Sequence, residues 1–371
     1  MSISLATYWR SVANGTRSNA SDRLLLAFLI PFSLVYALAL RLRAILYRSG
    51  MARTKSLPRP VISIGNLTVG GAGKTPVTAH IARLLLARGY RVVVLSRGYG
   101  GSLEGTCLVV SDGATIMVQA EQCGDEPFLL ASTIPGLMVV TGSDRHAAGM
   151  LAMAQLSPDV FLLDDGFQHV RLKRDLNILL VDHVRPFGNG WTLPAGLLRE
   201  PASALNRADL IIRTRCPIGS NVAPLFVRKP CCSARHELVD VVPLSGGASF
   251  PLQTIQGKSA LAFAGIAEPQ LFFDDLRNRG LNVVKCMPFA DHTAYDQQRL
   301  DSIVSAMQSS GAQYCITTEK DGVKLSSAPP ELAQRTLLAR LSLALDDPES
   351  LEKSLLNLLQ KHTKVGYHRY F

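Results

Sequence analysis

Continuous runs of apolar residues alternate with segments of helix length over most of the chain. The first series of runs covers residues 61–65, 91–96, 137–142, 160–165 and 177–182. A helix is predicted over about 76–88, directly after the first run. Uninterrupted apolar strands separated by helices are typical of a parallel sheet that is covered on both faces. We therefore predict an α/β/α core of three layers.

The same pattern restarts in the last third of the chain. Apolar runs at 260–266, 281–289 and 312–318 are separated by predicted helices over about 271–280 and 295–310. Between the two series, the chain is richer in Pro, Gly, Ser and Cys, which is typical of a connector. The predicted division is an N-terminal hydrophobic and basic anchor, a larger α/β/α core, a β connector and a smaller α/β/α domain, at residues 1–50, 51–220, 221–254 and 255–371.

The N-terminal segment contains a long uncharged stretch. Residues 24–40 form a run of 17 residues between Arg23 and Arg41. As a helix this run would reach about 26 Å, which is close to the roughly 30 Å of a hydrocarbon core. A secretory signal and a buried core helix are the alternatives, but no small-residue cleavage site follows. Arginines on both flanks favour a membrane anchor that spans the bilayer or lies half-sunk in it, with a kink at Pro31.

The charge is concentrated in the same region. The chain has a formal net charge of +10, and residues 1–60 carry nine basic side chains against one acid, Asp22. This distribution favours an anionic membrane surface as partner and keeps the following body on the cytoplasmic side. Basic and aromatic residues are not interleaved elsewhere, so we expect no nucleic acid partner, and no obligate protein partner is predicted. The seven cysteines form no C-x-x-C pair, which argues against a zinc site.

A glycine-rich motif follows the first apolar run. The sequence TVGGAGKTP matches the phosphate-binding loop Gly-x-x-x-x-Gly-Lys-Ser/Thr except at its first position, Thr68. In such a loop the backbone N–H groups bind phosphate, Lys74 contacts the β- and γ-phosphates and Thr75 offers its hydroxyl to Mg²⁺. The alternative is an ordinary glycine-rich turn. We predict that ATP is bound by Thr68, Val69, Gly70, Gly71, Ala72, Gly73, Lys74 and Thr75.

Carboxylates follow two other segments of the first series. Asp164 and Asp165 stand where the run 160–163 ends and are candidate Mg²⁺ ligands together with Thr75, while Asp182 competes for that role. Asp125 precedes a predicted helix. It either caps that helix or acts as a general base toward an acceptor hydroxyl. His292, in the second series, is either a residue that orients the base or an ordinary loop histidine.

Further motifs accompany the phosphate loop along the chain. In order, the set is TVGGAGKTP, LSRGYGG, GDEPFLL, SDRHAAG, LLDDGFQH, PAGLLREP, FADH and TTEKDGVKL. Behind an N-terminal hydrophobic helix, this set resembles the tetraacyldisaccharide 4′-kinase family of lipid A biosynthesis, and the resemblance runs over nearly the whole chain. Phosphate loops of this family often begin with a residue other than glycine, so Thr68 fits the resemblance.

The resemblance implies an enzyme with a P-loop NTPase-like core at the cytoplasmic face of the inner membrane. Using ATP and Mg²⁺, such an enzyme phosphorylates the 4′-hydroxyl of an acylated disaccharide 1-phosphate lipid and forms lipid IVA. It also implies that Asp125 is the base, that His292 orients it and that Lys74 binds phosphate. Many relatives carry a second histidine where Thr293 stands here. Further site-lining residues implied by the resemblance are Glu126, Arg145, Arg199 and Glu200, with Lys320 and Asp321 as candidates near the nucleotide.

A membrane-attached P-loop switch NTPase that acts on a protein partner is the alternative function. The basic N-terminus and the phosphate loop would fit such a protein equally well. Dependence of ATP turnover on a sugar lipid would distinguish the two.

Overall fold

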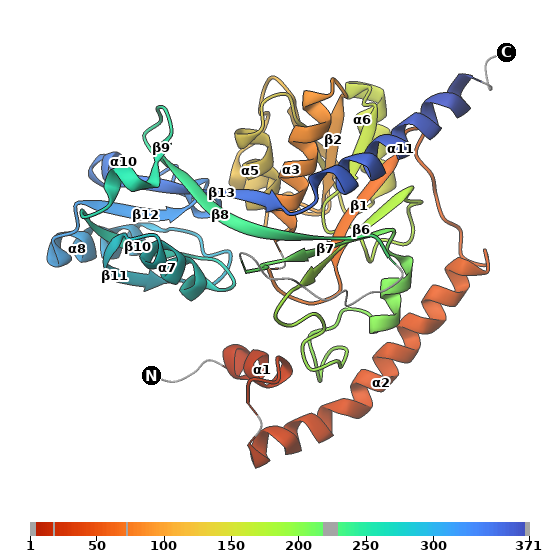
Figure 1. Cartoon of the computed structure of the whole chain (residues 1–371), viewed down its shortest axis with the longest axis horizontal. Helices are drawn as coiled ribbons and strands as arrows, with labels where there is room; N and C mark the ends of the chain where they lie inside the picture. Colours follow the sequence, from red (N-terminus) through yellow and green to blue (C-terminus); the bar gives the residue numbers. More distant parts are fainter. Residues whose placement is uncertain (1–4, 18, 72, 218–228, 368–371) are drawn as a thin grey trace.

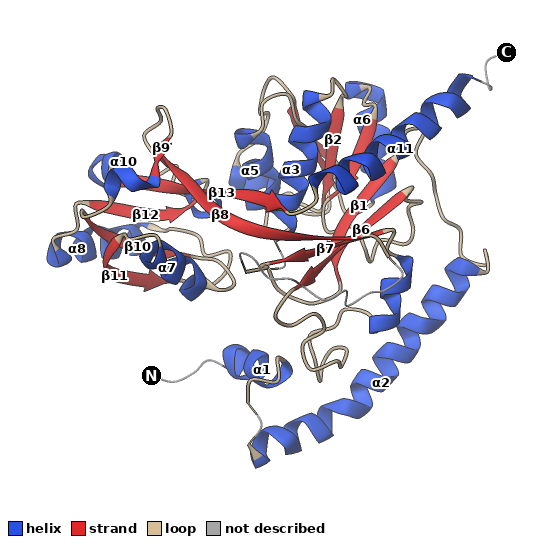
Figure 2. Ribbon diagram, in the orientation of Figure 1, coloured by secondary structure: helices blue, strands red, loops and turns tan. Residues whose placement is uncertain are grey.

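The computed structural model describes residues 5–17, 19–71, 73–217 and 229–367. Within these residues, two α/β units share one sheet of 13 strands (Figures 1 and 2). The strand order is β11-β10-β12-β13-β8-β7-β6-β1-β5-β2-β4-β3, and β9 pairs with β8. The fold is therefore of the α/β class with a large parallel portion, as predicted.

The first unit contains the strands that position the glycine-rich loop. Parallel pairing joins β1 (Val61–Asn66) to β5 and β6, β2 to β4 and β5, and β6 to β7. All six residues of β1 are buried, including the polar Ser63 and Asn66. Since parallel strands end at the same edge of a sheet, their carboxyl ends bring distant loops together. The other strands of this unit are β2 (Val92–Ser96), β3 (Leu108–Asp112), β4 (Met138–Thr141), β5 (Val160–Leu163), β6 (Leu176–Asp182) and β7 (Leu210–Thr214).

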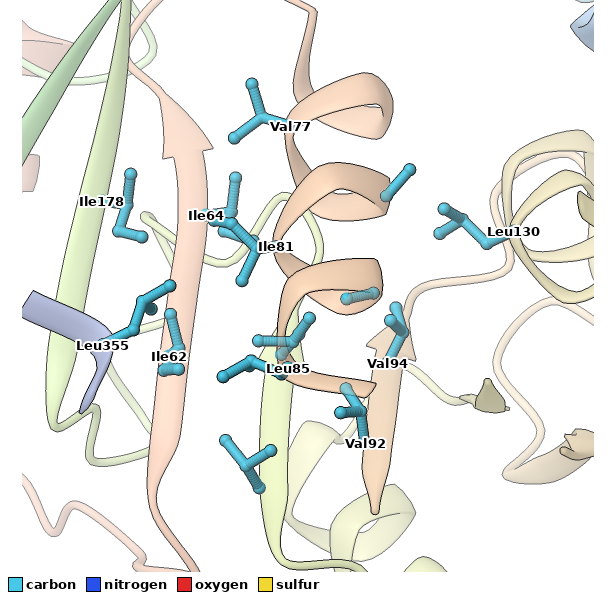
Figure 3. Close-up of a cluster of buried hydrophobic side chains, with 14 of the residues drawn as sticks. Ile62, Ile64, Val77, Ile81, Leu85, Val92, Val94, Leu130, Ile178 and Leu355 are labelled. Carbon is cyan, nitrogen blue, oxygen red and sulfur yellow. The ribbon is translucent and has the colours of Figure 1, made fainter. Parts of the chain in front are cut away.

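Helices pack on this sheet through side chains that meet the strands. Figure 3 shows Ile81 and Leu85 of α3 (Lys74–Ala87) against Ile62 and Ile64 of β1. All four side chains are fully buried. This packing fixes α3 directly behind the loop that precedes it. The remaining helical segments of the unit are α4 (Ala120–Cys123), α5 (Asp125–Thr133), α6 (Arg145–Leu156) and the 3-10 turn η1 (Ala202–Arg207).

The second unit has its own parallel strands and two separate apolar clusters. Strand β10 (Ser259–Ala264) pairs in parallel with β11 (Asn282–Pro288) and β12 (Tyr314–Thr318), and β12 pairs with β13 (Thr336–Leu345). Its helical segments are η2 (Leu252–Ile255), α7 (Pro269–Asn278), α8 (Gln297–Ser310), α9 (Glu319–Gly322) and α10 (Pro330–Arg335).

A single long strand joins the two units. Strand β8 (Cys231–Pro243) pairs in parallel with β7 through its first residues and antiparallel with β13 along the rest. The short β9 (Phe250–Pro251) lies against β8. The last helix, α11 (Pro348–Tyr367), returns to the first unit, where Leu351, Leu355 and Leu359 join its core. The domain boundaries stay a prediction, and α11 belongs by packing with the first unit although it falls in the predicted range 255–371.

Two helices precede the sheet, α1 (Leu5–Ala13) and α2 (Ala20–Arg48). Helix α2 is continuous through Pro31 and longer than the predicted uncharged run. In the described part of the chain, it is the one helix that is long and apolar enough to cross a membrane, by length and composition. Only 6% of its most apolar window is buried. It is therefore not a core helix, and the exposed apolar surface supports membrane association.

Candidate active site

The glycine-rich loop lies between β1 and α3, as the sequence predicts. Gly70 and Gly73 have φ angles of 123° and 74°, which L side chains rarely adopt, so glycine is required at both positions. The first N–H groups of α3 have no partner within the helix, which makes this end of the helix suited to an anion. The prediction for Ala72 lies outside the described residues.

Thr68 is accommodated by a neighbouring segment. Asn66 Nδ2 donates to the carbonyl oxygen of Thr68 at 2.9 Å and reaches its hydroxyl at 3.3 Å. A β-bridge joins Thr68 to Leu198, and Val69 N donates to Leu197 O at 2.8 Å. The segment PAGLLREP thus braces the loop entry, and the side chain of threonine supplies a hydrogen-bond acceptor that glycine would lack.

The two consecutive carboxylates reach the loop from the end of β5. Lys74 Nζ lies 3.6 Å from Asp165 Oδ1 and 3.4 Å from Asn66 Oδ1. Arg199 donates to Asp165 Oδ2 at 2.7 Å. Thr78, one turn into α3, donates to Asp164 Oδ1 at 3.0 Å. The structure therefore brings Lys74, Asp164, Asp165 and Arg199 together, and it places Thr75 in the first turn of the same helix.

Charge makes the two carboxylates unequal. Burial, followed by the nearby charges of Glu126 and Asp165, raises the pKa of Asp164 to about 7. Burial acts on Asp165 as well, but the charges of Lys74 and Arg199 outweigh it and lower the pKa of Asp165. Asp164 is thus a carboxyl group that lacks a sufficient positive charge nearby, which is the environment that a divalent cation would complete.

The competing candidate Asp182 has other partners. Its carboxylate accepts hydrogen bonds from the backbone N–H groups of Val184 and Arg185 at 2.9 and 3.0 Å, and it pairs with Arg215 at 3.4 Å. These contacts close the turn after β6. The geometry therefore favours Asp164 and Asp165 over Asp182 as the candidate metal ligands.

A second group of side chains joins the two units. His292 Nδ1 lies 3.2 Å from Asp125 Oδ2, as in a hydrogen bond donated by the ring N–H. Asp125 is the first residue of α5. Among the described residues, its side chain contacts His292 and accepts no hydrogen bond from the backbone N–H groups of the helix. Burial by itself would raise the pKa of Asp125, but the hydrogen bond to His292 and the charges of Lys324 and Lys320 lower it.

Lys320 connects this group to Glu126. Its ammonium lies 3.3 Å from Glu126 Oε1 and 3.4 Å from Asp291 Oδ1. Burial lowers the pKa of Lys320, but the three acids around it, Glu126, Asp291 and Asp125, raise it overall. The charge of Glu126 also raises the pKa of Asp164. Glu126 therefore lies close enough to interact both with Lys320 beside Asp125 and with the carboxylates beside the phosphate loop.

The two remaining predicted site-lining residues differ in their placement. The buried guanidinium of Arg145 donates to Gly142 O, and it interacts electrostatically with both Asp164 and Asp165. Burial lowers the pKa of Arg145 to about 10. Glu200 instead pairs with Arg207 at 2.6 Å, whose guanidinium lies over the Phe167 ring. Through Arg207, Glu200 thus supports Phe167, two residues after Asp165.

Several residues of the site escaped sequence reasoning. Thr78 and Lys324 carry contacts to Asp164 and Asp125. His236 of β8 packs on Gly73, where an added Cβ would collide with its ring. Arg215 donates to Gly71 O and pairs with Glu268 of the second unit at 2.9 Å. In TTEKDGVKL, Lys324 follows Lys320 by four positions, and this spacing could have marked Lys324 as a neighbour of Lys320 in the site. No sequence pattern indicates the long-range contact of His236.

Taken with the fold, this geometry defines a P-loop kinase-like protein with a second α/β unit at its phosphate loop. Comparisons with known proteins specify the family. A family model described as tetraacyldisaccharide-1-P 4′-kinase matches residues 25–360. The chain belongs to the tetraacyldisaccharide-1-P 4′-kinase family, and its activity is that of a 4′-kinase in lipid A biosynthesis.

Individual members of the family are similar to this chain over nearly its full length. The chain is 64% identical over 361 residues to a tetraacyldisaccharide 4′-kinase of Pelobacter propionicus, with coverage of 97% of this chain and 100% of the relative. It is 51% identical to that of Geobacter sulfurreducens, with coverage of 96% and 100%. The crystal structure of the "apo" form of LpxK from Aquifex aeolicus in complex with ATP superposes with a TM-score of 0.76 at 34% identity, covering 90% of this chain and 99% of that one. Family membership decides against the switch NTPase.

Proposed function

We propose that this chain binds ATP and Mg²⁺ at residues 68–75 and transfers the γ-phosphate to the 4′-hydroxyl of a tetraacylated disaccharide 1-phosphate at the cytoplasmic face of the inner membrane. The observation that carries the proposal is the convergence of three groups at one edge of the sheet. These are the phosphate loop with Lys74, the carboxylates Asp164 and Asp165, and the pair of Asp125 with His292. The ATP complex of the Aquifex relative supports the nucleotide assignment.

The phosphates of ATP are bound by the loop and by the start of α3. The backbone N–H groups around Gly70, Gly71 and Gly73 face the anion, and Lys74 exchanges its contacts with Asn66 and Asp165 for phosphate oxygens. Arg145, buried beside the carboxylates, adds a second positive charge near the transferred group.

Thr75, Asp164 and Asp165 are the residues that would hold Mg²⁺. They fit this role because Asp164 is buried with a raised pKa and Asp165 Oδ1 is a buried oxygen that accepts no hydrogen bond from the described residues. Among those residues, no group of three or more His, Cys, Asp or Glu has an arrangement that could hold a metal ion by itself. Phosphate oxygens and water would supply the remaining ligands. When bound, Mg²⁺ neutralises charge on the phosphates.

Asp125 accepts the proton of the acceptor hydroxyl. A lowered pKa keeps this carboxylate ionised, and His292 fixes its orientation from the second unit. Glu126 is held by Lys320 beside it. The base comes from the first unit and its orienting residue from the second. The acceptor is therefore enclosed between the two units, and this enclosure excludes water as a competing acceptor.

Helix α2 brings the enzyme to its lipid substrate. Ser33, at the middle of the helix, is fully buried. Its Oγ donates to Thr192 O at 2.9 Å and accepts from Ala195 N at 2.8 Å. A helix attached to the folded body at its midpoint lies along that body, so we infer that α2 lies in the membrane interface with its apolar face in the acyl region. The exposed Arg41 and Arg48 then meet anionic headgroups, while Arg43 donates to Gln168 O at 3.3 Å and helps to attach the helix.

The test is a transfer assay with purified protein, ATP, Mg²⁺ and a panel of glycolipids. We expect ATP consumption that depends on the tetraacylated disaccharide 1-phosphate, with the new phosphate located at the 4′-position. The same lipid with its 4′-hydroxyl blocked is the control and should give no product. ATP turnover that ignores the lipid, or phosphate at another position, would contradict the proposal.

A further inference from the structure

A buried lysine lies behind the proposed base. Lys324 has only 8% of its side chain exposed, and its ammonium lies 2.9 Å from Asp321 Oδ1 and 3.7 Å from Asp125 Oδ2. The same ammonium lies 5.4 Å from the centre of the Tyr295 ring. A cation buried in this way is confined by its two carboxylate partners and the ring face.

Asp321 is the fixed end of this arrangement. It is completely buried, and its Oδ2 accepts hydrogen bonds from Gly265 N at 3.0 Å and from Thr318 Oγ1 at 2.8 Å. These contacts tie it to β10 and to the end of β12. Lys324 is therefore held by the second unit, whereas Asp125 belongs to the first.

The contacts to Asp125 are divided unequally between its two oxygens. His292 and Lys324 both approach Oδ2. Within the described residues, no hydrogen bond or ion pair reaches Oδ1. A carboxylate that is held through one oxygen presents the other in a defined direction, and Oδ1 is the atom available to accept a proton.

We propose that Lys324 is a positioning residue of the kinase: anchored by Asp321 in the second unit, it holds Oδ2 of Asp125 in the first unit, so that Oδ1 is aimed at the acceptor hydroxyl only when the two units meet. The proposal rests on the assignment of Asp125 as the base. It adds a second anchor from the second unit to the contact with His292. Loss of this anchor would release the carboxylate even with His292 in place.

Electrostatics at Asp125 agree with this role. The groups that act on its charge are His292, Lys324 and Lys320 from the second unit, and Asp125 in turn acts on Tyr295 and on Cys123. Lys324 is one of the charges that lower the pKa of Asp125. Removal of this charge should therefore raise the pH at which the base becomes protonated.

The experiment measures the full-length enzyme with ATP and the tetraacylated disaccharide 1-phosphate across a pH series. For Lys324→Met we expect a loss of kcat of about tenfold or more with little change in the KM for ATP. We also expect the acidic limb of kcat/KM to move up by about one pH unit. Lys324→Arg, which keeps the charge, should restore the position of that limb. Lys353→Met, an exposed lysine of α11, is the control and should behave as the wild type.

A structural ion pair would give a different result. If Lys324→Met lowers the melting temperature but leaves the acidic limb and kcat of the folded fraction unchanged, the positioning role is wrong. Should Lys324→Met fail to fold, Asp321→Asn and Lys324→Arg decide. If Asp321→Asn leaves the acidic limb of kcat/KM where it is in the wild type, whatever its kcat, then Asp321 does not anchor Lys324 for this role.

The double variant Asp125→Asn/Lys324→Met separates this proposal from the assignment of the base. If Asp125 is the base and Lys324 acts through it, the second substitution should cost nothing further in kcat. Near-normal activity of Asp125→Asn alone would overturn the base. An inactive Asp125→Asn beside a normal Lys324→Met would overturn only the role of Lys324.

Discussion

His292 Nδ1 and Asp125 Oδ2 lie 3.2 Å apart although 167 positions separate the two residues in the chain. Asp125 opens α5 in the first unit, and His292 lies in the turn after β11 in the second. His292 has φ of 59°, a conformation that is uncommon for residues other than glycine and is held by its surroundings. The pair therefore depends on how the two units meet.

The first prediction concerns Asp125. Asp125→Asn keeps the size of the side chain but cannot accept the hydroxyl proton, so we expect kcat to fall about a hundredfold or more. ATP binding should be unchanged, because the phosphate loop is untouched. The measurement is 4′-phosphorylation beside nucleotide binding by calorimetry. Asp301→Asn, on the exposed side of α8, is the matched control, and equal activity of the two variants would remove Asp125 as the base.

The second prediction concerns Lys74. Lys74→Ala removes the ammonium beside Asp165, so we expect a loss of transfer of at least about a hundredfold and weaker ATP binding. Lys353→Ala should change neither. Since Lys74 also offsets the charge of Asp165, the variant should be less stable without nucleotide at pH 8. An unchanged rate at saturating ATP would show that Lys74 does not contact the transferred phosphate.

The third prediction is a pH dependence set by Asp164. Burial raises the pKa of this carboxyl to about 7, so the folded state retains its proton where the unfolded chain has lost it. The stability from this group is present below about pH 4 and is lost as the pH rises through about 7.

Asp164→Asn should remove that loss. It should stabilise the nucleotide-free protein at pH 8 by as much as about 4 kcal/mol while lowering kinase activity. Thermal unfolding at pH 5 and pH 8 measures the effect, with Asp301→Asn as control. A variant that is destabilised at pH 8 and keeps the wild-type pH dependence would contradict the raised pKa.

The fourth prediction concerns the exposed face of α2. Leu24, Phe28 and Val35 are 73%, 67% and 70% exposed, so their replacement by serine should leave the fold stable. The loss of apolar surface should weaken binding to anionic vesicles by about tenfold or more. ATP binding should not change. The exposed Leu271→Ser on α7 is the control, and vesicle binding that is equal in both variants would contradict the role of α2.

Much of this protein could be predicted from its sequence where the determinants are local. Buried strands such as 61–65 and 160–163 show as apolar runs, and the loop between β1 and α3 is recognised because glycines, Lys74 and Thr75 occupy neighbouring positions. The apolar stretch of α2 is likewise readable from composition alone. The structure adds that the helix extends beyond the uncharged run, from Ala20 to Arg48, and continues through Pro31.

Contacts between distant segments could not be derived in this way. The return of α11 to the first unit brings Leu351, Leu355 and Leu359 into a core most of whose other residues lie far away in the chain. The bracing of Thr68 by residues 197–199 and the occupation of Asp182 by Arg215 depend on strand order at the sheet edge. None of these has a periodic signal in the sequence.

The phosphate loop, the parallel strands and the apolar N-terminal helix are predictable from the sequence, because each is encoded by residue types at short and regular spacing. The contact of Lys324 with Asp125, the hydrogen bond from Thr78 to Asp164 and the attachment of α2 through Ser33 become visible only in the folded chain. These contacts arise when the packing of buried side chains fixes separate segments against one another, and such packing depends on the whole set of neighbours at once.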